Sequence, residues 1–427
     1  MIANQPLLLL FSTLLTTAVA EPRNWTRVTD GPGARKLHGL VPLLSGALFL
    51  YAGFDNRSFS TNDGTNDAYL YTSSSAGGTW TRVADGPSAR YGHAMAPLSD
   101  GRVLMHGGNQ LDGICTNEAS LYTPPSSSSV SSNGKEEQGG TWTRVADGPS
   151  ARSGHAMAPL SDGRVFMYGG VDPSYAWDYL NGAYIYAGET WTRVADGPHA
   201  RSAHAMAPLS DGSILIHGGY AEWSTTVINS ITFNDTYIYT APSSTSSTSS
   251  VDLASSAGGT WTRVADGPVA RAYHAMAMLT GGLSDRVVVY GGMDMDNNAL
   301  NDVYVYDRLK YTKGTWTKVA AGPSARYGHA MAPLTDGRVL LYGGNDGGLY
   351  DFNNNDAWIN DFAGNPPPAI CCQAKSSDYK AKCAAFLDSK SCDDYSKGFG
   401  DFCAWKCGTL PTPPTTPPPP TDLVVSR

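Results

Sequence analysis

One segment recurs six times along this chain and constrains its fold more than any other feature. In the central copies it reads TWTRVADGP-x-AR-x-x-HAMA, where x varies. The units open at Trp25, Trp80, Trp142, Trp191, Trp261 and Trp316, at intervals of 55, 62, 49, 70 and 55 residues. Repeats of this period indicate modules that bury their apolar faces against one another. Because the repeated part varies so little, we expect it to be scaffold and the segments that differ to carry the specific function.

Each unit predicts four β-strands. In the second unit, residues 92–98 and 102–106 are short strand-like runs, and Asp100-Gly101 between them favours a tight hairpin. Gly107-Gly108 ends the second strand, where backbone freedom or close approach is needed. A variable loop then leads to a third strand with the pattern Tyr-x-Tyr, as at 184–186, whose alternation fits a half-buried strand. The next Trp marks a fourth strand at the outer edge.

These features together resemble a known family of repeats. The glycine doublet, the Tyr-x-Tyr strand, the following Trp and the Arg-x-x-His entry to the next unit are similar to kelch repeats over residues 24–361. The resemblance implies an all-β fold, a six-bladed kelch-type β-propeller with one four-stranded blade per repeat. Residues 24–28 supply a fourth strand without its first three, and residues 357–359 supply a third strand with no fourth. We therefore predict that the N-terminal strand completes the sixth blade, within a propeller domain spanning 21–362.

The N-terminal residues predict export. Residues 1–20 contain a short apolar core and end in Ala18-Val19-Ala20, the pattern of a cleaved signal peptide. We expect a secreted, extracellular or cell-wall-associated protein without membrane insertion, because no later apolar segment reaches the roughly 18 residues that span a bilayer. There, Asn24, Asn56 and Asn234 are candidate glycosylation sites, since each stands in an Asn-x-Ser/Thr pattern. The formal charge of -8 argues against nucleic acid as a partner, and we expect a monomer.

The cysteines are distributed unevenly. Six of them crowd near the C-terminus: Cys371, Cys372, Cys383, Cys392, Cys403 and Cys407. In an exported chain this density predicts a small disulfide-rich module over 371–408, whose pairing the sequence leaves open. A Pro-rich linker over 363–370 precedes the module, and a Pro/Thr-rich tail over 409–427 follows it. Cys115 stands alone among the repeats, either as a buried thiol or as one half of an intermolecular bond.

Two residues recur at the start of the first strand of every unit. The first is an Arg: Arg35, Arg90, Arg152, Arg201, Arg271 and Arg326. In a propeller these would ring one mouth of the central channel, where guanidinium groups suit the capture of carboxylates, and the kelch resemblance implies the same use. The alternative is a structural role, with each Arg bonded to loop carbonyls. The second is a His three residues later, which we expect to be structural because symmetric positions on separate blades lie too far apart to share one metal ion.

The loops between second and third strands differ in every blade and should share a face with the arginines. Blades three and four carry aromatic residues there that the repeat lacks: Tyr175, Trp177, Tyr179, Tyr220 and Trp223. Exposed aromatic side chains would provide stacking platforms for a sugar or anchors for a protein partner. The other interpretation is that these side chains cover the edges of the blades.

We therefore predict a secreted recognition module whose arginine-bearing face binds an extracellular protein or glycan. The chain has no hydrolase nucleophile elbow, zinc-protease motif or phosphate-binding glycine loop, so we predict no catalytic residue, metal or cofactor. Two alternatives stay open. One is an enzyme acting on a carboxylated sugar, because sialic acid mutarotases also contain a kelch propeller. The other is a structural component of a wall or matrix.

Overall fold

The computed structural model describes most of the repeat region and little of the two ends. The described residues are 25–55, 64–75, 77–111, 113–125, 139–172, 178–222, 230–243, 258–279, 285–308, 313–347, 353–362, 371–373 and 406–408. The predicted signal peptide, the linker over 363–370 and the tail over 409–427 lie outside them. Among the described residues, no helix has the length and apolar character that crossing a membrane requires.

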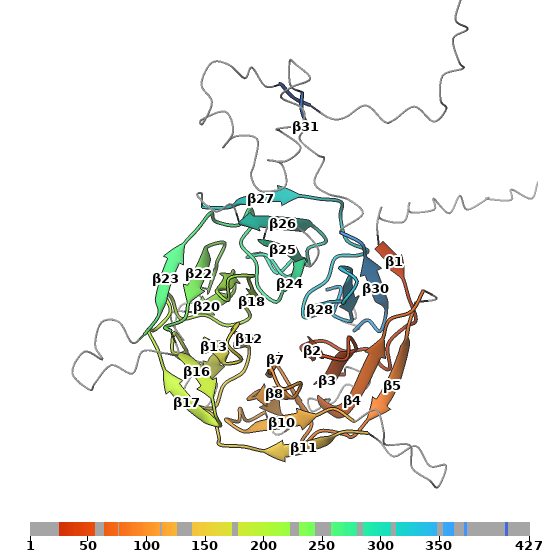
Figure 1. Cartoon of the computed structure of the whole chain (residues 1–427), viewed down its shortest axis with the longest axis vertical. Coiled ribbons are helices and arrows are strands. Elements are labelled where there is room, and N and C mark those ends of the chain that lie inside the picture. The colour runs from red at the N-terminus through yellow and green to blue at the C-terminus, as the bar shows by residue number, and fades with distance from the viewer. Residues whose placement is uncertain are drawn as a thin grey trace, which may run out of the picture.

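Six antiparallel sheets stand around a central axis as the blades of a β-propeller (Figure 1). Blade one contains β2 (Gly39–Pro42), β3 (Leu48–Phe54), β4 (Gly64–Thr72) and β5 (Thr79–Val83). Blade two contains β7 (Ala94–Pro97), β8 (Val103–His106), β10 (Ala119–Thr123) and β11 (Thr141–Arg144). Blade three contains β12 (Ala156–Pro159), β13 (Val165–Tyr168), β16 (Ala183–Ala187) and β17 (Thr190–Arg193).

The other three blades repeat this arrangement. Blade four contains β18 (Ala205–Pro208), β19 (Ile214–His217), β22 (Thr236–Thr240) and β23 (Thr260–Arg263). Blade five contains β24 (Ala275–Leu279), β25 (Asp285–Tyr290), β26 (Val303–Arg308) and β27 (Thr315–Lys318). Blade six contains β28 (Ala330–Pro333), β29 (Val339–Tyr342), β30 (Ala357–Asn360) and β1 (Trp25–Arg27). The predicted six-bladed all-β fold is confirmed.

The two ends of the repeat region close the ring, as the sequence predicts. β1 pairs antiparallel with β30, so that Trp25 lies opposite Asn360 and Arg27 opposite Trp358. The fourth strand of blade six thus comes from the N-terminal end of the repeats. Blade six is therefore built from both ends of the repeat region. Hydrogen bonds between β30 and β1, and not a continuous chain, close the ring.

The meander within each blade gives the propeller two distinct faces. The upper face carries the connections from second to third strands and from each fourth strand to the next blade. It includes three short strand pairs: β6 (Arg90–Tyr91) with β9 (Asn109–Gln110), β14 (Val171–Asp172) with β15 (Asp178–Tyr179), and β20 (Tyr220–Glu222) with β21 (Ser230–Thr232). The lower face carries the hairpins between first and second strands and the connections between third and fourth strands.

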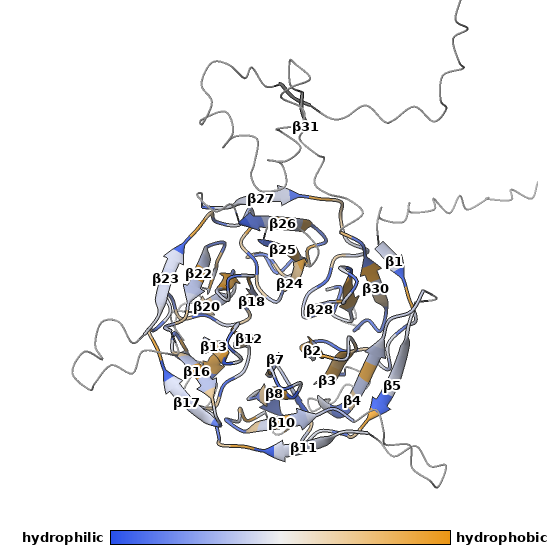
Figure 2. Cartoon of the chain, in the orientation of Figure 1, coloured by the Kyte–Doolittle hydropathy of each residue, from blue (hydrophilic) through white to orange (hydrophobic). Residues whose placement is uncertain are grey.

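The hydrophobic core is divided among the six junctions between blades. Each cluster of buried side chains draws on two neighbouring blades; one joins Phe49 and Tyr51 of blade one to Met105 and Tyr122 of blade two. Apolar residues accordingly concentrate on the inner strands, whereas the outermost strands are largely polar (Figure 2). A single blade could bury this surface only against its neighbours, so the ring is the unit that acquires a core.

The repeated Trp joins adjacent blades and does more than cover an outer edge. Trp142 of β11 packs on Tyr122 of its own blade and on Tyr51 of blade one, with ring centroids 5.2 and 4.7 Å apart. Its indole N–H also donates to the carbonyl of Ala84 in the preceding connection, at 3.2 Å. Trp80, Trp191, Trp261 and Trp316 donate in the same way to the preceding blade. The Trp is therefore common to all units because it bridges blades.

A closed ring of six backbone hydrogen bonds surrounds the axis beneath the upper face. Each residue immediately before a repeated His donates its N–H to the carbonyl of the equivalent residue in the previous blade, at 2.7 to 2.9 Å. The members are Leu37, Gly92, Gly154, Ala203, Tyr273 and Gly328. All six have a positive φ, between 55° and 65°, which is costly for Leu37, Ala203 and Tyr273. The ring ties every first strand to both neighbours and fixes the inner mouth of the propeller.

The C-terminal cysteine-rich segment is described only in part. Residues 371–373 form β31 and residues 406–408 form β32, and the two strands pair antiparallel with Cys372 opposite Cys407. Cys383, Cys392 and Cys403 lie outside the described residues. The disulfide-rich module over 371–408 and its pairing stay predictions.

Candidate functional site

The repeated arginines are the most deeply buried large side chains of the propeller. Arg35, Arg90, Arg152, Arg201, Arg271 and Arg326 are each at most 1% exposed. Each donates from Nη1 to the carbonyl that ends the second strand of its own blade, at 2.8 to 2.9 Å. In blade two, the backbone of the glycine pair also meets the next blade, because Gly108 N–H donates to Arg152 carbonyl oxygen at 2.9 Å. A Cβ on Gly107 would lie 2.6 Å from that oxygen, which explains the glycine.

Five of the six guanidinium groups are paired with a carboxylate of the same blade. Four of these carboxylates stand directly before the third strand of the blade, and that of blade one lies within β4. The guanidinium nitrogens are 2.6 to 2.8 Å from the carboxylate oxygens of Asp67, Glu118, Asp235, Asp302 and Asp356. Burial alone would lower the pKa of Arg201, but the hydrogen bond and charge of Asp235 outweigh it and raise that pKa. The arginines thus present no free guanidinium group to solvent. Of the two roles that the sequence left open, this geometry supports the structural one.

Arg152 of blade three differs from the other five because its carboxylate is missing. The equivalent position holds Gly182, so Arg152 keeps the bond to Gly169 carbonyl oxygen at 2.8 Å and a bond to Ser150 Oγ at 2.7 Å but has no carboxylate partner. Its guanidinium also lies over the Tyr184 ring, 5.3 Å from the centroid. Without a neutralising carboxylate, burial lowers the pKa of Arg152.

We expect Gly182→Asp to stabilise the protein by about 1–2 kcal/mol, because it would give Arg152 the charge-assisted hydrogen bonds that its five counterparts have. The backbone at Gly182 does not have the positive φ that would strain a side chain. The free energy of unfolding from urea denaturation measures the effect. Asn181→Asp, which adds the same charge one residue earlier, is the control. Equal stabilisation by both variants would show that net charge, and not the pairing with Arg152, is responsible.

The repeated histidines line the junctions between blades. His93 packs edge-on against Tyr51 of blade one, with centroids 5.1 Å apart, and His155 approaches His106 of blade two, with ring nitrogens 3.0 Å apart. His38, His204, His274 and His329 make the corresponding contacts. Burial lowers the pKa of His93 and of His106 to about 3, so the imidazoles are neutral. This arrangement accords with the predicted structural role.

A continuous arc of aromatic side chains follows the mouth of the channel on the upper face. In the first half of this aromatic arc, Tyr179 of β15 lies edge-on to Tyr220 of β20, with centroids 5.5 Å apart. Tyr220 continues to Tyr273, where the two hydroxyl oxygens are 2.9 Å apart. Tyr273 then approaches Tyr327 at 6.2 Å. These four side chains cross from blade three to blade six.

In the second half of the aromatic arc, the ammonium group of Lys36 lies between two aromatic rings. Lys36 Nζ lies 5.2 Å from the Tyr327 ring centroid and 5.6 Å from the Phe54 ring centroid. Phe54 is in turn edge-on to Tyr91, at 5.2 Å. Every member of the aromatic arc is partly exposed, so it offers aromatic surface and polar groups together. Cation and rings also attract each other, which helps to hold Lys36 over the mouth.

The aromatic arc only partly coincides with the predicted ligand residues. Tyr179 and Tyr220 are brought together, whereas Tyr175, Trp177 and Trp223 lie outside the described residues. Five members were not predicted from the sequence: Lys36, Phe54, Tyr91, Tyr273 and Tyr327. Four of them occupy the two variable positions between the repeated Arg and His, so the contrast between fixed and variable positions was a usable signal there.

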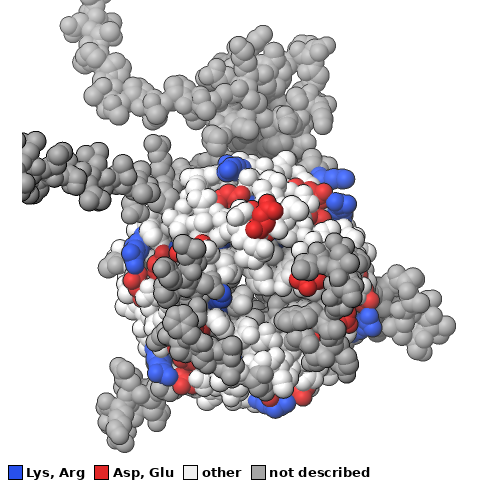
Figure 3. Space-filling view, turned by 180° about the vertical axis from the view of Figure 1, so that it is seen from behind, with Lys and Arg blue, Asp and Glu red and all other residues white. Residues whose placement is uncertain are grey.

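The surface around the aromatic arc combines apolar and acidic side chains on the loops with charged pairs at the rim. Exposed apolar side chains on the upper-face connections are Leu111, Ile114, Ile231 and Met295. Acidic and basic side chains instead alternate around the outer edge of the disc (Figure 3). Many are local pairs such as Arg193 with Asp196, at 2.9 Å. Exposed acidic side chains also stand on the upper-face connections, at Asp178, Glu222 and Asp296, so a partner approaching the mouth would meet aromatic, apolar and acidic groups together.

Comparison with known proteins places the fold in a family. The model described as KLHDC2/KLHL20/DRC7 Kelch-repeats domain matches residues 45–253, and the Kelch motif model matches residues 280–323. The chain belongs to the kelch-repeat family. A kelch propeller suggests a protein-binding module. The kelch protein is also similar to N-acetylneuraminate epimerase of Pasteurella multocida (strain Pm70), with 26% identity over 89 residues, which are 21% of this chain and 23% of that protein.

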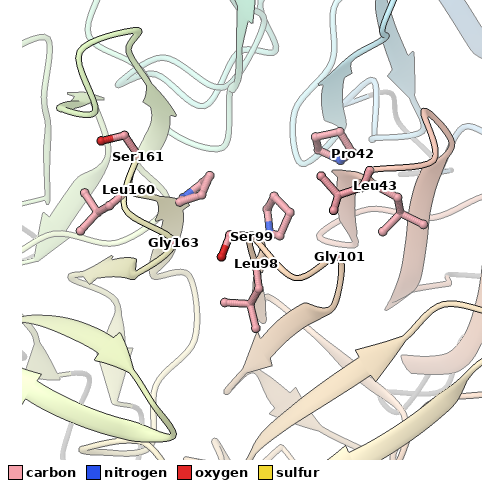
Figure 4. Close-up of a pocket in the computed structure, with 11 residues that line it drawn as sticks. Pro42, Leu43, Leu98, Ser99, Gly101, Leu160, Ser161 and Gly163 are labelled. Atoms are coloured by element: carbon pink, nitrogen blue, oxygen red, sulfur yellow. The ribbon is translucent and has the colours of Figure 1, made fainter.

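The lower face of this kelch protein is hollowed beside the axis. A cavity of about 280 Å³ is lined by the hairpins between first and second strands of blades one to three, with Leu43, Leu98 and Leu160 in its wall (Figure 4). Leu44 on the rim is 75% exposed. A second cavity lies between blades two and three and is more polar.

Two other predicted sites fall on described residues of the kelch protein. Asn234 is exposed, but its side-chain nitrogen, the atom that would carry a glycan, donates to Gly267 carbonyl oxygen at 3.3 Å. Cys115 is 4% exposed, and its thiol donates to Asn109 Oδ1 at 2.9 Å. Burial raises the pKa of this thiol to about 11. These contacts fit the buried-thiol interpretation better than an intermolecular bond.

Proposed function

We propose that this protein is an exported recognition module that binds an extracellular glycan or protein through the aromatic arc. The observation that carries the proposal is the continuity of the aromatic arc, which runs from Tyr179 through Tyr220, Tyr273, Tyr327, Lys36 and Phe54 to Tyr91. Aromatic side chains of this kind combine apolar stacking surface with hydrogen-bonding tips. They are also enriched among the residues that dominate binding energy at interfaces.

The buried arginines support this function indirectly. Arg201 and Arg271 stand directly before Ser202 and Ala272 and are bonded to the carbonyls that end the second strands of their blades. Ser202 then bridges to Tyr220, and Tyr273 directly follows Ala272, which bridges to Met293. The binding surface is therefore preorganised by the scaffold, which reduces the ordering cost of binding. Export and glycosylation are part of the proposal; export rests on the N-terminal sequence pattern and glycosylation on the Asn-x-Ser/Thr patterns at Asn24, Asn56 and Asn234.

We expect the double variant Tyr179→Ala/Tyr220→Ala to weaken ligand capture at least about tenfold while the protein stays folded. The measurement is binding of the exported protein to a glycan array and to immobilised extracellular matrix proteins. Tyr179→Phe/Tyr220→Phe keeps the rings and should retain most binding if stacking dominates. Arg193→Ala on the outer rim is the matched control. Undiminished capture by the alanine variant would contradict the proposed surface.

A second candidate function is catalysis on a carboxylated sugar. The match to N-acetylneuraminate epimerase favours it over other reactions, although the chain spans only 23% of that relative. Anomer interconversion of N-acetylneuraminate, followed by NMR with and without the protein, tests it. Acceleration abolished by Tyr179→Ala/Tyr220→Ala would favour the enzyme, whereas capture without acceleration would favour the recognition module.

A further inference from the structure

Blade three has an unusually tight connection between its third and fourth strands. β16 ends at Ala187 and β17 begins at Thr190, so Gly188 and Glu189 form the whole turn. In blades one, two, four and five, the same connection has at least six residues, as between Thr72 and Thr79. Both turn residues have a positive φ, 52° and 66°, as a type I′ hairpin turn requires. Blade three therefore lacks residues equivalent to Gly77, Gly139 and Gly258, which lead into the fourth strand in the longer connections.

The tight turn leaves a buried tyrosine hydroxyl without a partner. The equivalent hydroxyls of Tyr122, Tyr239 and Tyr306 donate to a carbonyl in the longer connection, at 3.4, 3.1 and 3.2 Å, and Tyr71 donates to Gly77 in the same way. Tyr186 is 3% exposed, and its hydroxyl has no hydrogen-bond partner. A buried polar group left in this state is destabilising unless something else satisfies it.

Tyr186 lines the second lower-face cavity, which has a volume of about 380 Å³. Asp100 and Arg102 of the blade-two hairpin line the same cavity and are paired at 2.7 Å. Glu189 of the tight turn completes the charged part of the wall. Its positive φ is a backbone conformation that is costly for Glu, and such strain is found preferentially at functional sites. The volume is within the range of small-molecule sites.

The wall chemistry selects a class of ligand. The carboxylates of Asp100 and Glu189 accept hydrogen bonds, whereas the Tyr186 hydroxyl and the Arg102 guanidinium donate them. A hydroxyl group both donates and accepts, so neighbouring hydroxyls match both kinds of group. The two carboxylates outnumber the one guanidinium, so the wall opposes an anion. A cation would have to compete with Arg102 for Asp100, to which Arg102 is already paired at 2.7 Å, whereas neutral hydroxyls can bond to all of these groups without breaking that pair. We propose that this cavity, which we call the blade-three cavity, binds a neutral sugar ring, with the hydroxyl of Tyr186 as one of its recognition groups.

The blade-three cavity is independent of the aromatic arc, because it opens on the opposite face of the propeller. Binding there does not require the proposed function, and the failure of one leaves the other standing. Tyr179→Ala/Tyr220→Ala, which alters only the upper face, should leave binding in the blade-three cavity unchanged.

The test is a titration of the full chain with D-glucose, D-galactose and D-mannose, followed by saturation-transfer NMR and calorimetry. D-glucosamine and D-glucuronate are the cationic and anionic counterparts. We expect at least one neutral sugar to bind, and both charged sugars to bind more weakly. Tyr186→Phe removes only the hydroxyl and should weaken binding by about tenfold, the value of one hydrogen bond. Glu189→Gln should weaken it in the same direction.

Tyr239→Phe is the matched control, because its hydroxyl donates to Gly258 within blade four. It should leave sugar binding unchanged but lower the melting temperature, whereas Tyr186→Phe should not lower the melting temperature because no hydrogen bond is lost. The proposal is overturned if no neutral sugar binds, if a charged sugar binds more tightly, or if Tyr186→Phe binds as well as the unaltered protein.

Discussion

Acidification from pH 7 to pH 5 is expected to destabilise this protein steeply, because eight of its nine histidines are buried in the neutral form. Burial lowers the pKa of His93, His204 and His329 to about 3, from an ordinary value of 6.5. The unfolded chain therefore binds protons that the folded chain does not, so stability is complete above pH 6.5 and falls as the pH drops toward 3. Each histidine contributes about 1.4 kcal/mol per pH unit in that window. Urea denaturation at several pH values measures the slope.

The propeller itself supplies the substitution that isolates this effect. Blades two and four end their second strand with His106 and His217, where the other four blades have Tyr. The space is equivalent, since a Cβ on Gly148 would meet His106 at 2.0 Å just as one on Gly86 would meet Tyr51 at 2.0 Å. We expect His106→Tyr/His217→Tyr to reduce the loss between pH 7 and pH 5 by about a quarter, because two of eight titrating groups are removed. An unchanged pH dependence would assign the acid sensitivity to other groups.

Arg201→Ala is expected to lower the free energy of unfolding by about 3–5 kcal/mol, because it leaves a buried carboxylate without its partner. Arg201 is fully buried, donates to both oxygens of Asp235 at 2.6 and 2.8 Å, and lies 4.2 Å from the Phe233 ring centroid. Asp235 is itself buried. Urea denaturation at pH 7 measures the loss.

Two control variants test whether the loss in Arg201→Ala comes from breaking the buried ion pair with Asp235 or from removing any arginine. Arg193→Ala removes an Arg whose side chain is 61% exposed and paired with Asp196 at the rim, and it should change stability by less than about 1 kcal/mol. The double variant Arg201→Met/Asp235→Leu removes both buried charges and should recover part of the loss. If Arg201→Ala were as mild as the rim variant, the arginines would not be the structural elements that their burial indicates.

The repeat count, the four strands per unit and the closure of blade six by the N-terminal strand could all be predicted from local patterns in the sequence. These properties depend on local periodicity and on residues repeated in every unit, such as the glycine pair whose backbone must approach the next blade at Arg152. The sequence also separated scaffold from variable positions, and so found Tyr179 and Tyr220 of the aromatic arc.

The role of the repeated arginines and the course of the aromatic arc depend on how the blades pack together. The pairing of Arg201 with Asp235 spans 34 positions, and the acid falls outside the repeated segment that drew attention to the Arg. Lys36 contacts Tyr327 across the closure of the ring, 291 positions apart. Partners this distant are set by how blades pack around an axis, and local sequence patterns carry no information on that packing. The Tyr186 hydroxyl lacks a partner for a similar reason. The turn of blade three is too short to supply a carbonyl, whereas the longer connections of four other blades each bring one to the equivalent hydroxyl.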